Sequence, residues 1–108
     1  MKSADMTKLA TLRRPVEARD SDGQLVHSYA EVATVWANVR PLRGGEAVMQ
    51  ARLASRSPAI ITVRASGTSR QLTSEWQAVV DGRTYHLRED PRETQDRAFL
   101  EFLAEAVA

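Results

Sequence analysis

Two Asp-Gly dipeptides, each flanked by extended runs, constrain the fold of this chain more than any other feature of its sequence. Glycine accepts a positive φ at no steric cost, so Asp-Gly between two extended runs is a strong signal for a β-hairpin. The dipeptides are Asp22-Gly23 and Asp81-Gly82. The strands that flank them are predicted over residues 12–18, 25–42, 76–80 and 84–88. We therefore expect an antiparallel sheet built around two hairpins.

The run 35–42 leads out of the first hairpin. It is apolar and rich in β-branched residues, ends in Pro41, and opens onto Gly44-Gly45. This pattern is typical of a strand that delivers the chain into a loop or a short helix. The strand before it is predicted to break near residues 30–31. Pro15 places the first strand at an edge of the sheet, because proline cannot donate to a β-ladder.

Residues 46–56 have the propensity of a short helix that leaves the sheet. Glu46 in its first turn and Arg56 in its last turn would each match the helix dipole. The apolar stripe is narrow, so such a helix would be held weakly by its own domain and is a candidate for partner contact. Pro58 is expected to end it, and residues 59–64 form the next predicted strand.

The segment 97–106 fits either a helix or a strand. Its apolar residues recur at helical spacing, but Ala98, Leu100, Phe102 and Ala104 also alternate with other positions. The hairpin before it needs a further strand to bury its apolar face, so we predict a strand. The predicted fold class is mainly β: a small antiparallel β-barrel or sandwich with one short helix in the excursion around 45–56.

The length of 108 residues predicts one domain, residues 1–108, with a loose N-terminal arm at about residues 1–9. The chain has no cysteine, so neither a disulfide nor a thiolate metal site can form. Its first residues lack the apolar core of a signal peptide, and no run is long enough to span a bilayer. We therefore expect a soluble protein that no cleaved signal exports.

The charges are unevenly distributed along the chain, although the net charge of +1 is too small to bind nucleic acid through the overall field. Residues 38–72 carry six arginines against one glutamate, whereas residues 73–108 carry eight acidic residues against four arginines. Opposite signs on different parts of a small domain suit a head-to-tail contact between identical copies, which can close into a ring. Scattered solvated charge explains the same pattern, and both interpretations stay open.

No residue pattern indicates a catalyst. His27 and His86 lie in alternating strand patterns without partners at metal-ligand spacing, so solvent-facing positions are expected. No nucleophile-elbow motif occurs, and Gly44-Gly45 lacks the lysine and the Ser or Thr of a phosphate loop. We expect no enzyme, no catalytic residue, no cofactor and no metal. Trp36 and Trp76 could stack on bases, but their strand patterns favour core packing.

Four arginines form the candidate site. They belong to the excursion that follows the first hairpin: Arg40, Arg43, Arg52 and Arg56. Arg52 and Arg56 are four residues apart and would share one face of a helix, where like charges repel mildly unless an anion lies between them. The excursion is interpreted either as a surface that faces DNA phosphates or an acidic neighbour, or as a solvated surface helix.

Several segments, taken in their order and spacing, resemble the head-tail joining family of tailed phages. These are the small head-closure or stopper proteins of long-tailed phages, related prophages and gene transfer agents. The segments are Arg14-Pro15-Val16-Glu17 before Asp22-Gly23, residues 32–42 followed by Gly45-Glu46, residues 60–64, residues 80–87 and Leu100-Glu101-Phe102-Leu103. They cover nearly the whole chain, and the last of them is similar to the final strand of the family.

The resemblance implies a homo-oligomeric ring of compact β-barrels or sandwiches, a hexamer or else a dodecamer. Portal-adaptor proteins would lie above the ring and the tail terminator or other tail components below it. The ring would continue and close the DNA channel, join the tail, and meet non-specific double-stranded DNA in its lumen. The protein would act in the neck of a phage or gene transfer agent particle, after assembly in the cytoplasm of the bacterial host.

Two other interpretations stay open. The chain could be another neck ring component, a tail terminator or an adaptor, although adaptors are expected to be largely helical. It could also be a small β-barrel nucleic-acid-binding module. Such a module would need aromatic residues interleaved with basic residues on one exposed face.

Overall fold

The computed structural model of the chain describes residues 3–42 and 56–107, and these residues are mainly β, as predicted. The helix predicted over 46–56 falls on residues outside the described ones, except that Arg56 opens a strand. The described elements, in chain order, are η1 (Ser3–Asp5), β1 (Lys8–Arg19), β2 (Leu25–Pro41), β3 (Arg56–Arg64), η2 (Ser69–Gln71), β4 (Gln77–Val80), β5 (Arg83–Leu87), β6 (Arg92–Glu93) and β7 (Phe99–Val107). Both η elements are single 3-10 turns.

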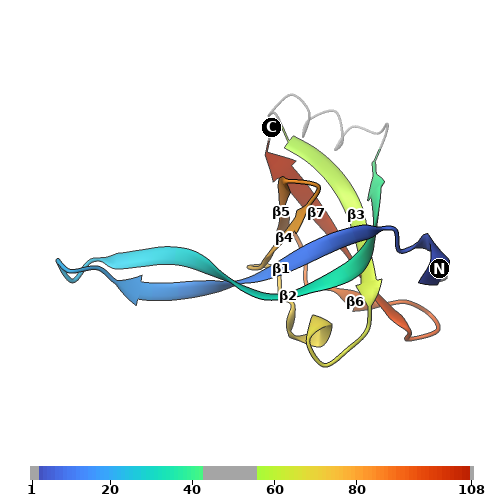
Figure 1. Cartoon of the computed structure of the whole chain (residues 1–108), viewed down its shortest axis with the longest axis horizontal. Coiled ribbons are helices and arrows are strands. Elements are labelled where there is room, and N and C mark those ends of the chain that lie inside the picture. Colours follow the sequence, from blue (N-terminus) through green and yellow to red (C-terminus); the bar gives the residue numbers. More distant parts are fainter. Residues whose placement is uncertain (1–2, 43–55, 108) are drawn as a thin grey trace.

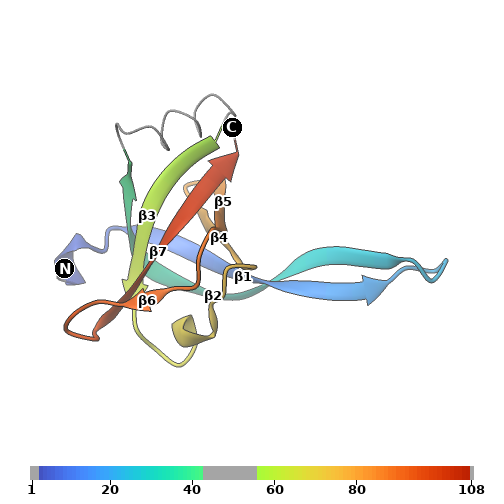
Figure 2. The ribbon, with the colours of Figure 1, turned by 180° about the vertical axis from the view of Figure 1, so that it is seen from behind.

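The strands close into a barrel. Antiparallel pairing among the described residues runs from β3 through β2, β1, β4, β5 and β7, and then returns from β7 to β3. The short strand β6 adds to β7 beyond this circuit. Figure 1 and Figure 2 show the resulting barrel from two sides, with the β1–β2 hairpin projecting from it. Of the two architectures expected from the sequence, the barrel is the one observed.

Alternate side chains of the strands fill the barrel interior. On β3 and β7, the buried inward side chains are Ala59, Ile61, Val63, Leu100, Phe102, Ala104 and Ala106. Ile61 and Phe102 are direct partners across the β3–β7 ladder, and both have no exposed surface. Small alanines beside large side chains suit the limited space inside a small barrel. The strand predicted over 97–106 is therefore confirmed, although Ala98 lies before β7 and is exposed.

The β1–β2 hairpin extends well beyond the barrel as a two-stranded ribbon. Pairing between β1 and β4 stops at Arg13, whereas pairing between β1 and β2 continues to the end of β1, where Arg19 faces Leu25. We call residues 14–30 the ribbon. Pro15 lies in it, and among the described residues β2 is the strand that pairs with β1 there, so one edge of β1 is open at Pro15. The prediction that the first strand itself lies at an edge of the sheet is wrong, because β1 lies between β2 and β4 over residues 10–13.

A β-bulge marks the point where the ribbon leaves the barrel. The pairing steps from Leu12 facing Ala33 to Arg13 facing Glu31, which leaves Val32 without a partner on β1. A bulge bends a strand and increases its twist without ending it. The break predicted in this strand is this bulge, and β2 continues through it.

Both predicted hairpin turns are present. Asp81 and Gly82 form a two-residue turn in which both residues have positive φ, 53° and 73°, as a type I′ turn requires. In the first turn Gly23 has a φ of 77°. There the Oδ1 atom of Asp20 accepts hydrogen bonds from the backbone N–H groups of Asp22 and Gln24, both at 2.9 Å.

Two strand starts and one short strand differ most from the sequence prediction, while the other strand ends differ by one or two residues. β1 begins at Lys8, before residue 12, because the outer face of the strand is open to solvent and tolerates polar residues. Pro58 lies within β3, at the end of the β2–β3 ladder, where its carbonyl accepts a hydrogen bond from Leu42 N–H at 3.1 Å. The N–H that proline lacks would face the same side as this carbonyl, beyond the last β2–β3 pair, so the β3–β7 ladder, in which Pro58 faces Glu105, loses no hydrogen bond. Residues 92–93, for which the sequence predicted no strand, form β6.

The type I′ turn predicts the effect of one substitution. Gly82→Ala should lower the free energy of unfolding by about 1–2 kcal/mol, because a Cβ is strained at this positive φ. A Cβ at Gly82 meets nothing within 4 Å, so the loss reports backbone strain alone. Gly67→Ala is the matched control, since its Cβ also meets nothing and its φ lies outside the positive range. Equal urea midpoints for the two variants would contradict this account.

Candidate assembly surface

The structure brings two of the four candidate arginines to one end of the barrel. Arg40 is exposed near the end of β2, and the backbone of Arg56 opens β3, so both flank the segment 43–55 (Figure 1). The hydrogen bond between Leu42 N–H and the Pro58 carbonyl holds the two flanks together. Arg43 and Arg52 lie outside the described residues. The basic excursion therefore begins and ends at this barrel end.

Part of the charge separation along the chain is neutralised within one copy. Arg70 from the basic third pairs with Glu93 from the acidic third, and this hydrogen bond holds the pKa of the Glu93 carboxyl below its ordinary value. Within the acidic third, Arg92 Nε lies 3.2 Å from Glu101 Oε1, and Arg92 also pairs with Glu89. These pairs are partly exposed, so each contributes little to stability. They nevertheless reduce the opposite charge available to a neighbouring copy.

The two histidines have different neighbours and do not form a common site. His27 is exposed on the ribbon, with Nδ1 3.8 Å from Glu17 Oε1, whereas His86 is half-buried, with Nδ1 3.3 Å from the side-chain nitrogen of Gln77. Within residues 3–42 and 56–107 we find no group of three or more His, Asp or Glu side chains that could hold a metal ion. The same residues contain no helix with the length and hydrophobicity needed to cross a membrane.

Core packing is observed for Trp76, but the same prediction is wrong for Trp36. Trp76 is 7% exposed, whereas Trp36 is 57% exposed. The reason is the alternation of β2: Val35, Ala37 and Val39 face the barrel core, so Trp36 faces outward together with Asn38 and Arg40. The sequence contained this signal. Asn38 and Arg40 are polar, and they occupy alternate positions of the strand on the same face as Trp36.

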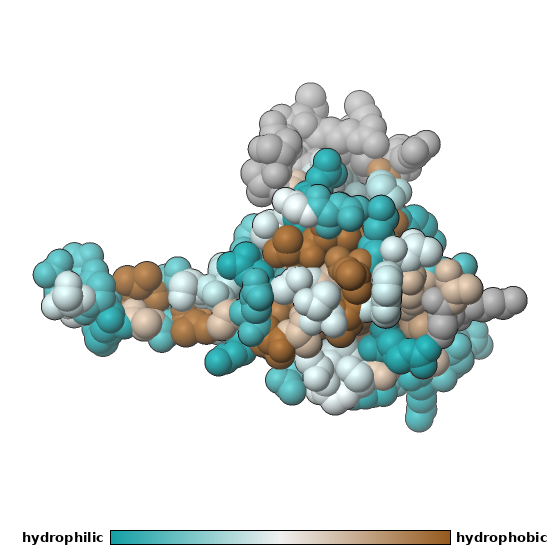
Figure 3. Space-filling model, in the orientation of Figure 1, coloured by the Kyte–Doolittle hydropathy of each residue, from teal (hydrophilic) through white to brown (hydrophobic). Residues whose placement is uncertain are grey.

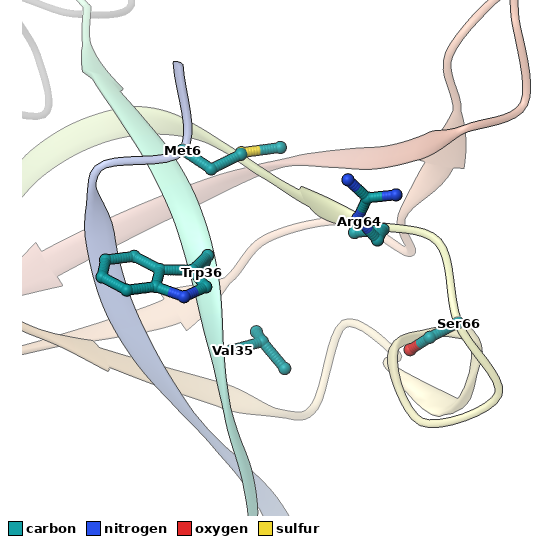
Figure 4. A pocket seen from close by; sticks show the side chains of 5 residues that line it. All are labelled: Met6, Val35, Trp36, Arg64 and Ser66. Carbon is teal, nitrogen blue, oxygen red and sulfur yellow. The ribbon is translucent and has the colours of Figure 1, made fainter. Parts of the chain in front are cut away.

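Exposed Trp36 borders a pocket of about 420 Å³ (Figure 4). The pocket lining consists of Met6, Val35, Trp36, Arg64 and Ser66. Three hydrogen bonds hold its walls in place. The Asn38 side-chain nitrogen donates to the Asp5 carbonyl at 3.0 Å beside Met6, and fully buried Ser69 accepts from Ser66 N–H at 2.8 Å while donating to the Arg64 carbonyl at 2.7 Å. We call this site the Trp36 pocket.

The large apolar side chains with high exposure all lie on the β1–β2 pair, among the residues that the structure describes. They are Leu9 (51%), Leu25 (51%), Val26 (40%), Val32 (36%) and Trp36 (57%). Leu9 and Trp36 are direct cross-strand partners on the barrel wall, whereas Leu25 and Val26 lie at the far end of the ribbon. Figure 3 shows hydrophobic residues at intervals along the ribbon. Exposed apolar side chains that are direct neighbours, as Leu9 and Trp36 are, make this part of the barrel wall a candidate interaction surface.

A model of the family described as phage head completion protein matches residues 1–107. The chain belongs to the phage head completion protein family. It is a structural protein of the phage head–tail neck, and the resemblance drawn from its sequence is confirmed. As a component of such particles, this head completion protein associates with other head and tail proteins.

Solved structures share the fold of this head completion protein. Protein SF1141 from Shigella flexneri 2a, known from a solution structure, is 18% identical, with a TM-score of 0.73; the alignment covers 100% of this chain and 98% of that one. A chain from the virion of a native gene transfer agent particle is 23% identical, with a TM-score of 0.66; the alignment covers 94% of each chain. A search of curated proteins found no match.

The two tryptophans give a matched prediction. Trp36→Ala should change the free energy of unfolding by less than about 1 kcal/mol, because the side chain is largely exposed. Trp76→Ala should cost about 3–5 kcal/mol, because it removes a large buried side chain. Urea unfolding of the two variants measures the difference. A loss at position 36 as large as that at position 76 would mean that Trp36 belongs to the core.

Proposed function

We propose that this head completion protein forms a ring between the portal-adaptor proteins and the tail. The ring continues and closes the DNA channel, and it offers the surface on which the tail joins. Six copies form it, with twelve as the alternative, and tail-terminator or other tail components bind below. Assembly takes place in the cytoplasm of the bacterial host. The observation that carries the proposal is the family match over residues 1–107.

The role is mechanical and involves no reaction. A barrel closed by hydrogen bonds around its whole circumference is stiff, which suits a unit of a channel wall. The ribbon extends the longest dimension of the molecule to 48 Å and gives each copy the reach to contact a neighbour (Figure 1). A stiff body with one projecting element is a suitable repeating unit for a closed ring.

DNA contact is assigned to the basic end of the barrel. Arg40 and Arg56 flank the excursion there, and Arg43 and Arg52 lie within it. Arginines that touch phosphates bind duplex DNA without reading its sequence, which a channel that passes a whole genome needs. We therefore propose that these four arginines face the lumen.

The composition of the exposed surface disfavours a free nucleic-acid-binding module. Among the six aromatic residues, Trp36 alone is largely exposed, and the other five are buried or half-buried. A stacking platform needs several exposed rings in series. The β content also disfavours an adaptor, which is expected to be largely helical. A tail terminator remains the alternative within the neck.

Charge reversal in the excursion tests the DNA contact. Arg52→Glu combined with Arg56→Glu should leave the purified chain folded but reduce DNA retention in particles severalfold, because phosphates would then meet carboxylates. Circular dichroism measures the fold, and nuclease-protected DNA per purified particle measures retention. Arg88→Glu combined with Arg97→Glu is the control, since it makes the same charge change at exposed positions outside the excursion.

The results of this experiment distinguish DNA contact by the excursion from an effect of net charge and from a free nucleic-acid-binding module. Normal DNA retention and tail joining in the excursion variant would overturn the assignment of DNA contact. Equal losses in both variants would show that net charge alone matters. Salt-dependent binding of short DNA by the isolated single copy, with a strength comparable to that of known binding modules, would favour the free nucleic-acid-binding module instead.

A further inference from the structure

Four of the five large apolar residues found exposed in the described part of the chain form two separate sets at the two ends of the β1–β2 pair. Leu25 and Val26 lie at the ribbon tip, whereas Leu9 and Trp36 lie on the barrel wall beside the Trp36 pocket. In Figure 1 the tip lies at one end of the long axis, and the N-terminal turn η1 lies at the other. Met6, which lines the pocket, follows η1 directly. The two sets therefore lie toward opposite ends of the molecule.

The two sets cannot meet within one copy. Positions 25 and 36 are eleven residues apart along β2, which corresponds to as much as about 36 Å of strand. β2 begins at the tip and runs into the barrel wall, and the tip points away from the barrel of its own molecule (Figure 1 and Figure 2). Only the pocket of another copy can receive it.

The ribbon has a physical reason to find a partner. A two-stranded ribbon without a third strand or a covering layer is marginally stable in water. On one face, the paired positions are Arg14 with Ala30, Val16 with Ser28, and Ala18 with Val26. This face carries mostly small or apolar side chains, and Ala18 and Val26 near the tip are exposed. Contact with a second surface would bury them.

The charges of the two ends are complementary. Residues 17–24 contain three acidic residues and one arginine, which gives the tip a net charge of −2. Arg19 Nη1 donates to the Gly23 carbonyl at 2.8 Å, so this arginine lies over the turn. The charged member of the pocket lining is Arg64, whose guanidinium lies 6.0 Å from the centre of the Phe99 ring. An acidic tip with apolar neighbours thus matches an apolar pocket with a cationic wall.

We propose that the ribbon tip of one copy docks in the Trp36 pocket of the next copy around the ring. Val26, on the face of the ribbon that also carries Ala18, packs against Trp36 and Met6, while the acidic turn faces Arg64. The contact is heterologous, because each copy contributes its ribbon tip to one neighbour and its Trp36 pocket to the other. Repetition of such a contact can close a ring. This inference rests on the proposed ring and identifies the contact that holds it.

Engineered cysteines test the contact directly, because the natural chain has none. Gln24→Cys places a thiol at the tip, and Thr7→Cys places one beside Met6 at the pocket; both positions are exposed. In oxidised particles that carry the double variant, we expect a ladder of covalent dimers, trimers and larger species. Each single variant should give no ladder. Gln24→Cys with Ser74→Cys is the control pair, since Ser74 is exposed and, unlike Thr7, is not next in sequence to a residue that lines the pocket.

Truncation of the apolar anchors measures the strength of the contact. Trp36→Ala and Val26→Ser should each lower the yield of tailed, DNA-filled particles about tenfold or more, because a central tryptophan and its apolar partner dominate such interfaces. Val32→Ser is the matched control, since Val32 is an exposed apolar residue outside both sets. Unfolding curves of the purified variants separate lost folding from lost assembly.

Each result decides one claim. Rings seen in electron micrographs of normal particles, but without a ladder from the double variant, would overturn the docking contact and leave the ring standing. A ladder formed equally by the control pair would also overturn it. A tip thiol that cross-links to a different neck protein would assign the ribbon to another partner and overturn the inference. Absence of any ring in normal particles would overturn the proposed function itself.

Discussion

The pairing of β7 with β3 is the contact on which the rest of the structure depends. It runs over nine residue pairs, from Arg56 facing Val107 to Arg64 facing Phe99, and it joins the last strand to one near the middle of the chain. On its other side β7 receives β5 and β6. Without this ladder the barrel would be an open sheet whose interior, centred on the Ile61–Phe102 pair, would face water. Closure therefore pairs the backbone hydrogen-bonding groups of the strand edges and buries the core at the same time. The core then does not depend on the part of the β1–β2 hairpin that projects from the barrel.

Local signals in the sequence predicted the hairpins well, because an Asp-Gly turn is decided by its own backbone geometry. The turn at Asp81-Gly82 has the positive φ angles that this dipeptide favours. The last strand was harder, since its apolar spacing also suits a helix. The need to cover the preceding hairpin, together with the resemblance to the final strand of the family, decided for a strand. Barrel closure and the length of the ribbon are non-local. No segment of β1 reveals from its own residues that β4 stops pairing at Arg13.

The candidate site was predicted less completely than the fold. Sequence composition drew attention to the arginines, whereas the structure draws attention to apolar side chains on β1 and β2. The exposure of Trp36 was missed because a tryptophan in an apolar strand is usually buried. This expectation outweighed the observation that Asn38 and Arg40, on the same face of the strand as Trp36, are polar. The apolar residues at the ribbon tip were missed for another reason. Leu25 is exposed only because the hairpin extends past the last strand that could cover it.

The ribbon also faces a problem that any unpartnered strand pair has before assembly. An exposed strand edge is a template for pairing with other chains, and natural edges are often blunted by proline and by charge. The outer edge of β1 in the ribbon carries Pro15, which offers no N–H, and its exposed side chains include Arg14, Glu17 and Arg19. These features disfavour edge-to-edge pairing, while the apolar side chains at the tip are carried on the faces of the ribbon. A contact made by side chains on a face, and not by the backbone at an edge, can be specific for one shaped pocket. Because the edge is blunted and the apolar side chains lie on a face, the ribbon can avoid edge pairing as a single copy and still present a side-chain surface for the proposed docking.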